Sequence, residues 1–223
     1  MTDKHTDKQF RTPTLSDRVI GELDRALNNI FCKQVSSREY PATATNESEA
    51  APLSSTQKST SAGLMRVNHA GEMAAQALYQ GQSLTARDPK LADKLKHASI
   101  EESDHLNWCR NRLEELGERP SVFDPLWYAG SFAIGMAAGI AGDRWNLGFL
   151  AETEHQVVRH LDSHLQRLPE NDTRSRAIVG QMKIDEQGHA ELAEGLGAAD
   201  LPQPVKQIMK LTSKVMTSVA EKL

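Results

Sequence analysis

Apolar residues recur every three or four positions through most of the chain after residue 60. This spacing places them along one face of an α-helix. Four long stretches carry such an apolar stripe, at residues 61–87, 89–117, 143–168 and 171–196. Turn signals separate them in pairs, with Asp88-Pro89 between the first two and Pro169 to Asp172 between the last two. Because no run of alternating apolar residues indicates a strand, we expect an all-α protein built on a four-helix bundle.

Polar residues interrupt these stripes at core positions in all four stretches. They are Glu72, Glu102, His105, Glu154, Glu186 and His189. In both helical pairs a lone glutamate is followed, 30 or 32 residues later, by a Glu-x-x-His pair. Residues three apart share a face of a helix, so each pair aims a carboxylate and an imidazole in one direction. Counting 1.5 Å per residue out to each turn and back brings the glutamates to similar heights.

Four carboxylates and two imidazoles in a bundle core suit a metal centre. Buried carboxylates without a counter-charge are too unfavourable to persist, and two divalent cations would balance them. The same ligand arrangement is described for ferritin-like di-iron proteins, so the chain resembles a ferritin-like four-helix bundle. The alternative is that these are exposed, charged helix faces. A third pair, Glu152 with His155, falls off the stripe, which predicts a surface position or one behind the ligands.

The first 60 residues differ from the rest, and we interpret residues 1–60 as an arm attached to a domain of residues 61–223. Residues 15–32 predict a short amphipathic helix, and residues 33–60, rich in Ser, Thr, Ala and Pro, predict a flexible linker. The charged N-terminus lacks the apolar core of a secretory signal. The two cysteines are isolated, which favours a reducing compartment.

An apolar segment joins the two helical pairs between Pro120 and Gly142, and it carries no charge from Leu126 onward. It is shorter than the roughly 20 residues of a membrane span. Two interpretations remain open: a buried crossover helix, or an apolar surface that lies in the membrane interface or lines a lipid entrance. In the second interpretation the membrane or substrate face consists of Trp127, Phe132, Ile134 and Met136.

The last segment, residues 204–223, predicts an extra C-terminal helix with one apolar side. Lys206, Lys210 and Lys214 repeat every four residues on it. A basic amphipathic helix can rest on an anionic membrane surface, and the alternative is that it packs on its own domain. The net charge of −4 gives no reason to expect a nucleic acid partner.

Several strings resemble the demethoxyubiquinone hydroxylase family, whose bacterial members act late in ubiquinone biosynthesis. The most specific string is Arg66-Val67-Asn68-His69-Ala70-Gly71-Glu72. The others are Tyr79-Gln80-Gly81-Gln82, Glu102-Ser103-Asp104-His105, Pro125-Leu126-Trp127, Glu152-Thr153-Glu154 and Asp185-Glu186-Gln187-Gly188-His189. The resemblance covers about residues 61–223.

The resemblance implies an enzyme, a di-iron monooxygenase that hydroxylates the quinol ring of 3-demethoxyubiquinol with O₂ as co-substrate. It implies two Fe²⁺ ions on the six residues that the stripes select, with Glu102 as a bridging carboxylate and the second bridge undetermined. The electron donor stays unidentified. His155 stands where some relatives carry another glutamate, a departure that lies off the stripe.

Two further residues are candidates for supporting roles. Asp185 is interpreted as reaching across to orient His105, and the alternative is a solvated carboxylate. Tyr79 is interpreted as lining the cavity, and the alternative is an ordinary core tyrosine. Because a polyprenylated quinol resides in the bilayer, the resemblance also implies a peripheral enzyme on the cytoplasmic side of the cell membrane. Its partners would be the membrane surface and either a copy of itself or other ubiquinone-biosynthesis proteins.

Two other function classes fit parts of the pattern. A ferritin-like ferroxidase or iron-storage protein could use the same ligands, although the uncharged crossover speaks against it. A non-catalytic quinone-binding scaffold would have no reason to keep all six ligand residues.

Overall fold

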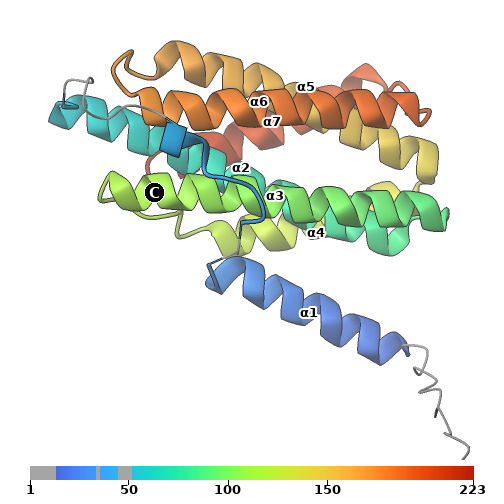
Figure 1. The fold of residues 1–223 in the computed structure, drawn as a ribbon. Coiled ribbons are helices and arrows are strands. Elements are labelled where there is room, and N and C mark those ends of the chain that lie inside the picture. The colour runs from blue at the N-terminus through green and yellow to red at the C-terminus, as the bar shows by residue number, and fades with distance from the viewer. Residues whose placement is uncertain (1–13, 34–35, 45–51) are drawn as a thin grey trace, which may run out of the picture.

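The computed structural model describes residues 14–33, 36–44 and 52–223, and over these residues the protein is all-α (Figure 1). The elements are α1 (Leu15–Phe31), the short 3-10 helix η1 (Pro41–Ala44), α2 (Ser55–Thr85), α3 (Pro89–Glu115), α4 (Asp124–Ile140), α5 (Asp143–Arg167), α6 (Thr173–Gly195) and α7 (Gln203–Ala220). The described residues form no strand, which confirms the all-α fold predicted from the sequence.

Helices α2, α3, α5 and α6 form the bundle, as two neighbouring pairs that pack on one another (Figure 1). Two apolar clusters fill its interior. One contains Leu64, Met65, Trp108, Leu113, Leu161, Ile178 and Met182. The other contains Tyr79, Leu91, Leu95, Leu147, Leu150 and Ala193. On each of these helices the polar core residues named above lie between the residues of the first cluster and those of the second. The polar site is therefore bordered by an apolar cluster on both sides along the bundle.

Helix α2 starts at Ser55, six residues earlier than the sequence analysis predicts. Ser54 caps the helix: its side chain accepts from the backbone N–H of Gln57, and the Gln57 side chain accepts from the backbone N–H of Ser54. The described part of the predicted linker at residues 36–44 also lies against the bundle, on α3 and α6. Residues 34–35 and 45–51 of that linker, like residues 1–13, lie outside the described residues.

The apolar crossover folds into α4, which packs along α2. The contact is close because of two glycines: a Cβ on Gly135 would meet the backbone of Leu78, and a Cβ on Gly81 would meet the backbone of Phe132. The other side of α4 leaves Ile134 and Ile140 exposed. The helix is therefore half-buried: its inner side agrees with the buried crossover helix, and contact of its outer side with a membrane or lipid stays a prediction.

Helix α7 packs on α2 and α5 and buries Ala220 at its end. Its outer side exposes Ile208, Leu211 and Val215. Of the three lysines predicted to form a basic ridge, Lys206 pairs with Asp200 at 2.8 Å. No helix among the described residues has both the length and the apolar character needed to cross a bilayer.

Candidate metal centre

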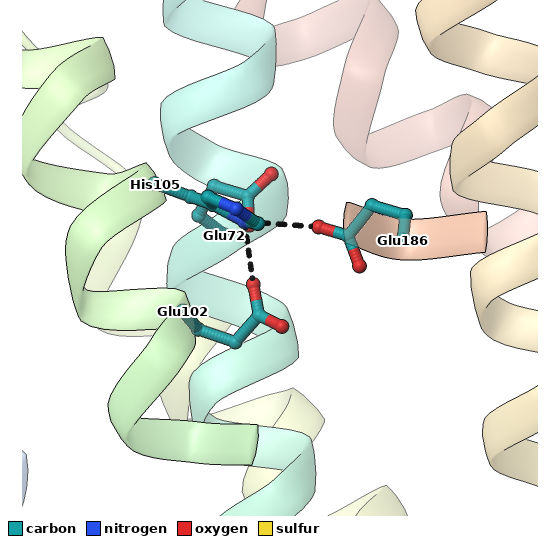
Figure 2. Close-up of side chains that lie close together, drawn as sticks. All are labelled: Glu72, Glu102, His105 and Glu186. Carbon is teal, nitrogen blue, oxygen red and sulfur yellow. Dashed lines mark hydrogen bonds and ion pairs between the residues drawn. The ribbon is translucent and has the colours of Figure 1, made fainter. Parts of the chain in front are cut away.

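The structure brings all six polar core residues together in two groups of candidate metal ligands. The first group contains Glu72, Glu102, His105 and Glu186, and the second contains Glu154, Glu186 and His189. Within each group the ligand atoms all lie within 4.8 Å of one another. All of these residues are buried except His189, whose side chain is 11% exposed. Figure 2 shows the first group, with side chains from α2, α3 and α6 pointing toward one another.

Both imidazoles turn Nδ1 toward the carboxylates. The Nδ1 of His105 lies 3.2 Å from Glu102 Oε2 and 3.0 Å from Glu186 Oε1 (Figure 2). The Nδ1 of His189 lies 3.2 Å from Glu102 Oε1 and 3.1 Å from Glu186 Oε2. Glu102 and Glu186 therefore each face both histidines with separate oxygens, which is the placement of a bridging carboxylate. The family resemblance implies Glu102 as one bridge and leaves the second undetermined, and this geometry makes Glu186 the candidate for it.

Each histidine has an acidic partner on its outer nitrogen. Asp185 Oδ2 lies 2.9 Å from His105 Nε2, and Glu101 Oε2 lies 3.0 Å from His189 Nε2. Asp185 is the residue that the sequence analysis chose for this contact, whereas Glu101 was missed. The signal was available, because each acid immediately precedes the glutamate of one Glu-x-x-His pair and contacts the histidine of the other.

Tyr79 crosses from α2 to the other helical pair and is fully buried. Its hydroxyl donates a hydrogen bond to Glu154 Oε1 at 2.7 Å. The tyrosine therefore contacts a candidate ligand directly and also belongs to the apolar cluster beside the site. Its packing agrees with the interpretation as a core tyrosine, and its role in lining a cavity stays a prediction.

Burial governs the electrostatics of the site. It raises the pKa of Glu72 and of Glu154, and the neighbouring carboxylates of Glu102 and Glu186 raise both further. Burial also opposes the charge on Glu102, but hydrogen bonds from both histidines outweigh it and hold the pKa of Glu102 well below its usual range. The pKa values of both imidazoles are raised. Although burial works against their charge, hydrogen bonds to the surrounding carboxylates raise the pKa of His189 to about 12.

The residues present fit two metal ions. Glu102 Oε1 and Glu186 Oε1 are buried oxygens that lie 3.2 and 3.0 Å from a histidine Nδ1 but accept no hydrogen bond of regular geometry. Such orphaned acceptors are rare in folded proteins and are commonly explained by an ion. The donor set of carboxylate oxygens and imidazole nitrogens suits first-row transition metals such as iron. In the metal-free protein, protons held by the imidazoles offset part of the carboxylate charge that cations would neutralise.

Comparison with known proteins places the chain in a family. Residues 59–220 match the family model described as ubiquinone biosynthesis protein COQ7. The chain belongs to the COQ7 family. This membership confirms the resemblance found in the sequence strings, and the match covers α2 from residue 59 onward, α3 to α6 and all of α7.

Curated relatives of this COQ7-family chain match it over almost its full length. A protein of Chromobacterium violaceum is 56% identical over 90% of this chain and 96% of its own. A protein of Dechloromonas aromatica is 54% identical over 92% of this chain and 97% of its own. Both relatives are named 3-demethoxyubiquinol 3-hydroxylase. Among solved structures, a dodecameric thioferritin of Bacteroides fragilis reaches a TM-score of 0.49 at 13% identity over 70% of this chain and 90% of its own, a likeness too low to carry an argument.

The third Glu-x-x-His pair lies outside both groups of this COQ7-family chain. His155 Nε2 contacts Glu194 at 2.8 Å, and Glu152 pairs with Arg159 at the surface. The stripe argument that set this pair apart therefore agrees with its position.

The four residues of the predicted membrane or substrate face lie along α4 and belong to neither ligand group. Ile134 is exposed, whereas Trp127, Phe132 and Met136 are half-buried. Phe132 packs against a buried cluster with Met73, and Trp127 packs against one with Val67. The exposed apolar surface of α4 is therefore carried by Ile134 with Leu126 and Ile140, and three of the four predicted residues also serve the fold.

Proposed function

We propose that the protein is a monooxygenase that hydroxylates the quinol ring of 3-demethoxyubiquinol in ubiquinone biosynthesis. Family membership and the shared name of relatives that are more than half identical support the activity and the substrate. The observation that carries the proposal is the buried cluster of four carboxylates and two imidazoles, which supplies a place for the chemistry.

The cofactor in this proposal is a pair of Fe²⁺ ions, with O₂ as co-substrate. Glu72 and His105 would bind one ion, Glu154 and His189 the other, and the two oxygens of Glu102 and of Glu186 would reach both. Bound iron supplies the electrons and the open coordination positions that oxygen chemistry requires.

The remaining residues at the centre prepare these ligands. In this proposal, the Nε2–H group of His105 donates a hydrogen bond to Asp185, and that of His189 donates one to Glu101. Nδ1 of each ring is then free to bind metal. The two apolar clusters keep bulk water away from the ligands on both sides along the bundle.

The experiment is to load metal-free protein with Fe²⁺, count the bound iron, and measure hydroxylated product from 3-demethoxyubiquinol with O₂ and a reductant. We expect two iron ions per chain and product that depends on both iron and O₂. Glu72→Ala and His189→Ala should lose iron and product. Glu152→Ala and His155→Ala are matched controls, because they alter a Glu-x-x-His pair that lies outside the two ligand groups. Iron uptake into a 24-subunit cage without product would instead support a ferroxidase.

We also propose that the enzyme meets its substrate at a membrane surface, with the outer side of α4 as the contact. A polyprenylated quinol partitions into the bilayer, and Leu126, Ile134 and Ile140 offer exposed apolar side chains on one helix. The test is sedimentation with anionic phospholipid vesicles. We expect Ile134→Glu to weaken binding, whereas Leu192→Glu, an equally exposed position on α6, should not. Equal binding by both variants would contradict the proposal.

A further inference from the structure

A short segment before the bundle, residues 36–44, contacts the outer side of the metal centre. We call this segment the strap. Figure 1 shows it in blue, passing in front of α3 and ending with η1 at α6. Its far end is fixed by Ala42, which is fully buried in the apolar core and whose carbonyl oxygen accepts a hydrogen bond from Arg174 at 3.2 Å. The strap is therefore packed on the bundle at η1 as well as at its first residues.

The strap begins on Asp104, the residue immediately before His105. Ser36 Oγ donates to one carboxylate oxygen at 2.9 Å, and Ser37 donates its backbone N–H to the same oxygen at 2.6 Å. The Ser37 hydroxyl donates to the other oxygen at 2.9 Å. Asp104 is only 1% exposed, so these donors satisfy a carboxylate that has little access to water. The strap is thereby tied to the helical turn that carries His105.

The next strap residue, Arg38, reaches His105 by two routes. Its guanidinium forms a forked pair with Asp185, at 2.7 and 3.2 Å, and Asp185 Oδ2 also contacts His105 Nε2. The guanidinium lies 5.0 Å from the centre of the Trp108 ring, which in turn lies 5.2 Å from the His105 ring. Arg38, Asp185, His105 and Trp108 therefore form a closed ring of contacts around the imidazole.

Among the described residues, the opposite histidine has a less restrained partner. The outer partner of His189 is Glu101, whose side chain is 57% exposed, whereas Asp185 is 17% exposed. The hydrogen bonds and ion pairs of Glu101 among the described residues include none from the strap. A forked guanidinium pair restrains a carboxylate far better than water does.

We propose that the strap holds His105 in its ligand position, so that the metal position of Glu72 and His105 binds more tightly than the position of Glu154 and His189. Arg38 is in this view a positioning residue that acts through Asp185. This inference rests on the proposed metal centre, and it predicts an inequality that the duplicated ligand motif alone would not produce.

The test is titration of metal-free protein with Co²⁺, a spectroscopic substitute for Fe²⁺, followed by visible absorption. We expect the wild-type protein to bind two ions in a tight and a weaker step. Arg38→Gln should weaken the tight step by at most about tenfold, because it acts behind Asp185, and loss of a histidine's direct partner weakens metal binding about 10- to 100-fold. Arg38→Lys, which keeps the charge but not the fork, should lose only a few-fold. Glu101→Gln should weaken the other step, and Arg159→Gln, a surface arginine 63% exposed, should change neither.

A double variant separates the proposed route from a general loss of packing. Once Asp185→Asn has removed the intermediary, we expect Arg38→Gln to weaken metal binding little further. Two equal steps in the wild-type protein would overturn the inference, and so would an Arg38→Gln variant that changes both steps equally or neither. A wild-type protein that binds no Co²⁺ would instead overturn the proposed metal centre. Thermal unfolding of each metal-free variant checks that it folds.

Discussion

The two helical pairs supply the same ligand types in unequal surroundings. Each pair contributes one lone glutamate and one Glu-x-x-His to the site. His105, from the first pair, is fully buried, and its partner Asp185 is held by the strap. His189, from the second pair, is 11% exposed, and its partner Glu101 lies largely in solvent. A cavity of about 260 Å³ borders both histidines on this outer side.

This contrast separates two kinds of information in the chain. The repeated spacing of the ligands along the helices decides which atoms meet, because helical periodicity fixes faces and heights. Residues outside the repeat decide how strongly each half is shielded and restrained. A duplicated motif can therefore build a symmetric set of donors in an asymmetric environment.

The largest effect should come from replacing a residue that belongs to both groups of candidate ligands. Glu186 belongs to both groups of candidate ligands, so we expect Glu186→Ala to lose both metal ions and to reduce product formation to background. Glu191→Ala is the matched control, since Glu191 is exposed on the same helix and bonds to Gln187. Iron counting and product analysis measure the outcome. Full retention of one ion by Glu186→Ala would contradict its placement between the two positions.

The two ends of the contact between α2 and α5 also differ, in whether they can respond to pH. At one end of the crossing Gln82 donates to the backbone of Asn146 at 3.0 Å, and at the other end His164 Nδ1 contacts Asn68 Oδ1 at 2.7 Å. The amide cannot titrate, but the histidine can. Burial, aided by His160 and Arg167, lowers the pKa of His164 to about 3. Acid should therefore destabilise the fold at His164, because it charges a buried imidazole, whereas the Gln82 end does not respond to pH.

The sign follows from proton binding. The unfolded chain binds a proton at His164 below pH of about 6.5, whereas the folded protein does not until about pH 3. His164 therefore lowers the free energy of unfolding as pH falls through this window, by about 3 kcal/mol between pH 7 and pH 4. We expect His164→Gln to flatten this part of the pH dependence in denaturant unfolding. His97→Gln, at an exposed histidine, is the control, and an unchanged slope in His164→Gln would contradict the assignment.

A third feature of the first helical pair is that α4 packs on α2, one of its two helices. A methyl group on Gly135 would meet the backbone of Leu78, so the two helices would have to separate. We expect Gly135→Ala to lower the free energy of unfolding by about 2 kcal/mol. Gly130→Ala, on the same helix with open space around it, should raise it by about 0.5 kcal/mol through helix propensity. Urea unfolding compares the two, and equal effects would show that the close contact is absent.

The sequence predicts the site and much of the bundle because both depend on periodicity. Glu72 and Glu186 could be matched across more than a hundred residues because each sits on an apolar stripe at a known distance from a turn. The start of α2 was set too late, although Ser54 and Gln57 form a recognisable capping box. Residues 33–60 share a linker-like composition, and only the capping box within them marks where the helix begins.

The strap and Glu101 could not be predicted in the same way. Residues 36–44 have no apolar period, and their hydrogen bonds to the bundle join residues that are 67 or more positions apart. Only the folded bundle brings Asp104 and Asp185 to one surface. Glu101 is exposed and lies off the stripe, so a search for buried polar residues passes over it. The strap contacts depend on tertiary structure and leave no local signal, whereas the one sequence signal for Glu101 is its place immediately before Glu102.

The smallest expected effect concerns the contact that joins the halves at Glu154. Tyr79, from the first pair, donates to Glu154 Oε1, so Tyr79→Phe removes one hydrogen bond and leaves the ring packing intact. We expect it to lower the free energy of unfolding by about 1 kcal/mol, the usual net contribution of one hydrogen bond. Because Glu154 belongs to the second group alone, Tyr79→Phe should also weaken the weaker Co²⁺-binding step a few-fold and leave the tight step unchanged. Co²⁺ titration measures both steps. Loss of the tight step instead would show that Tyr79 acts on the whole centre.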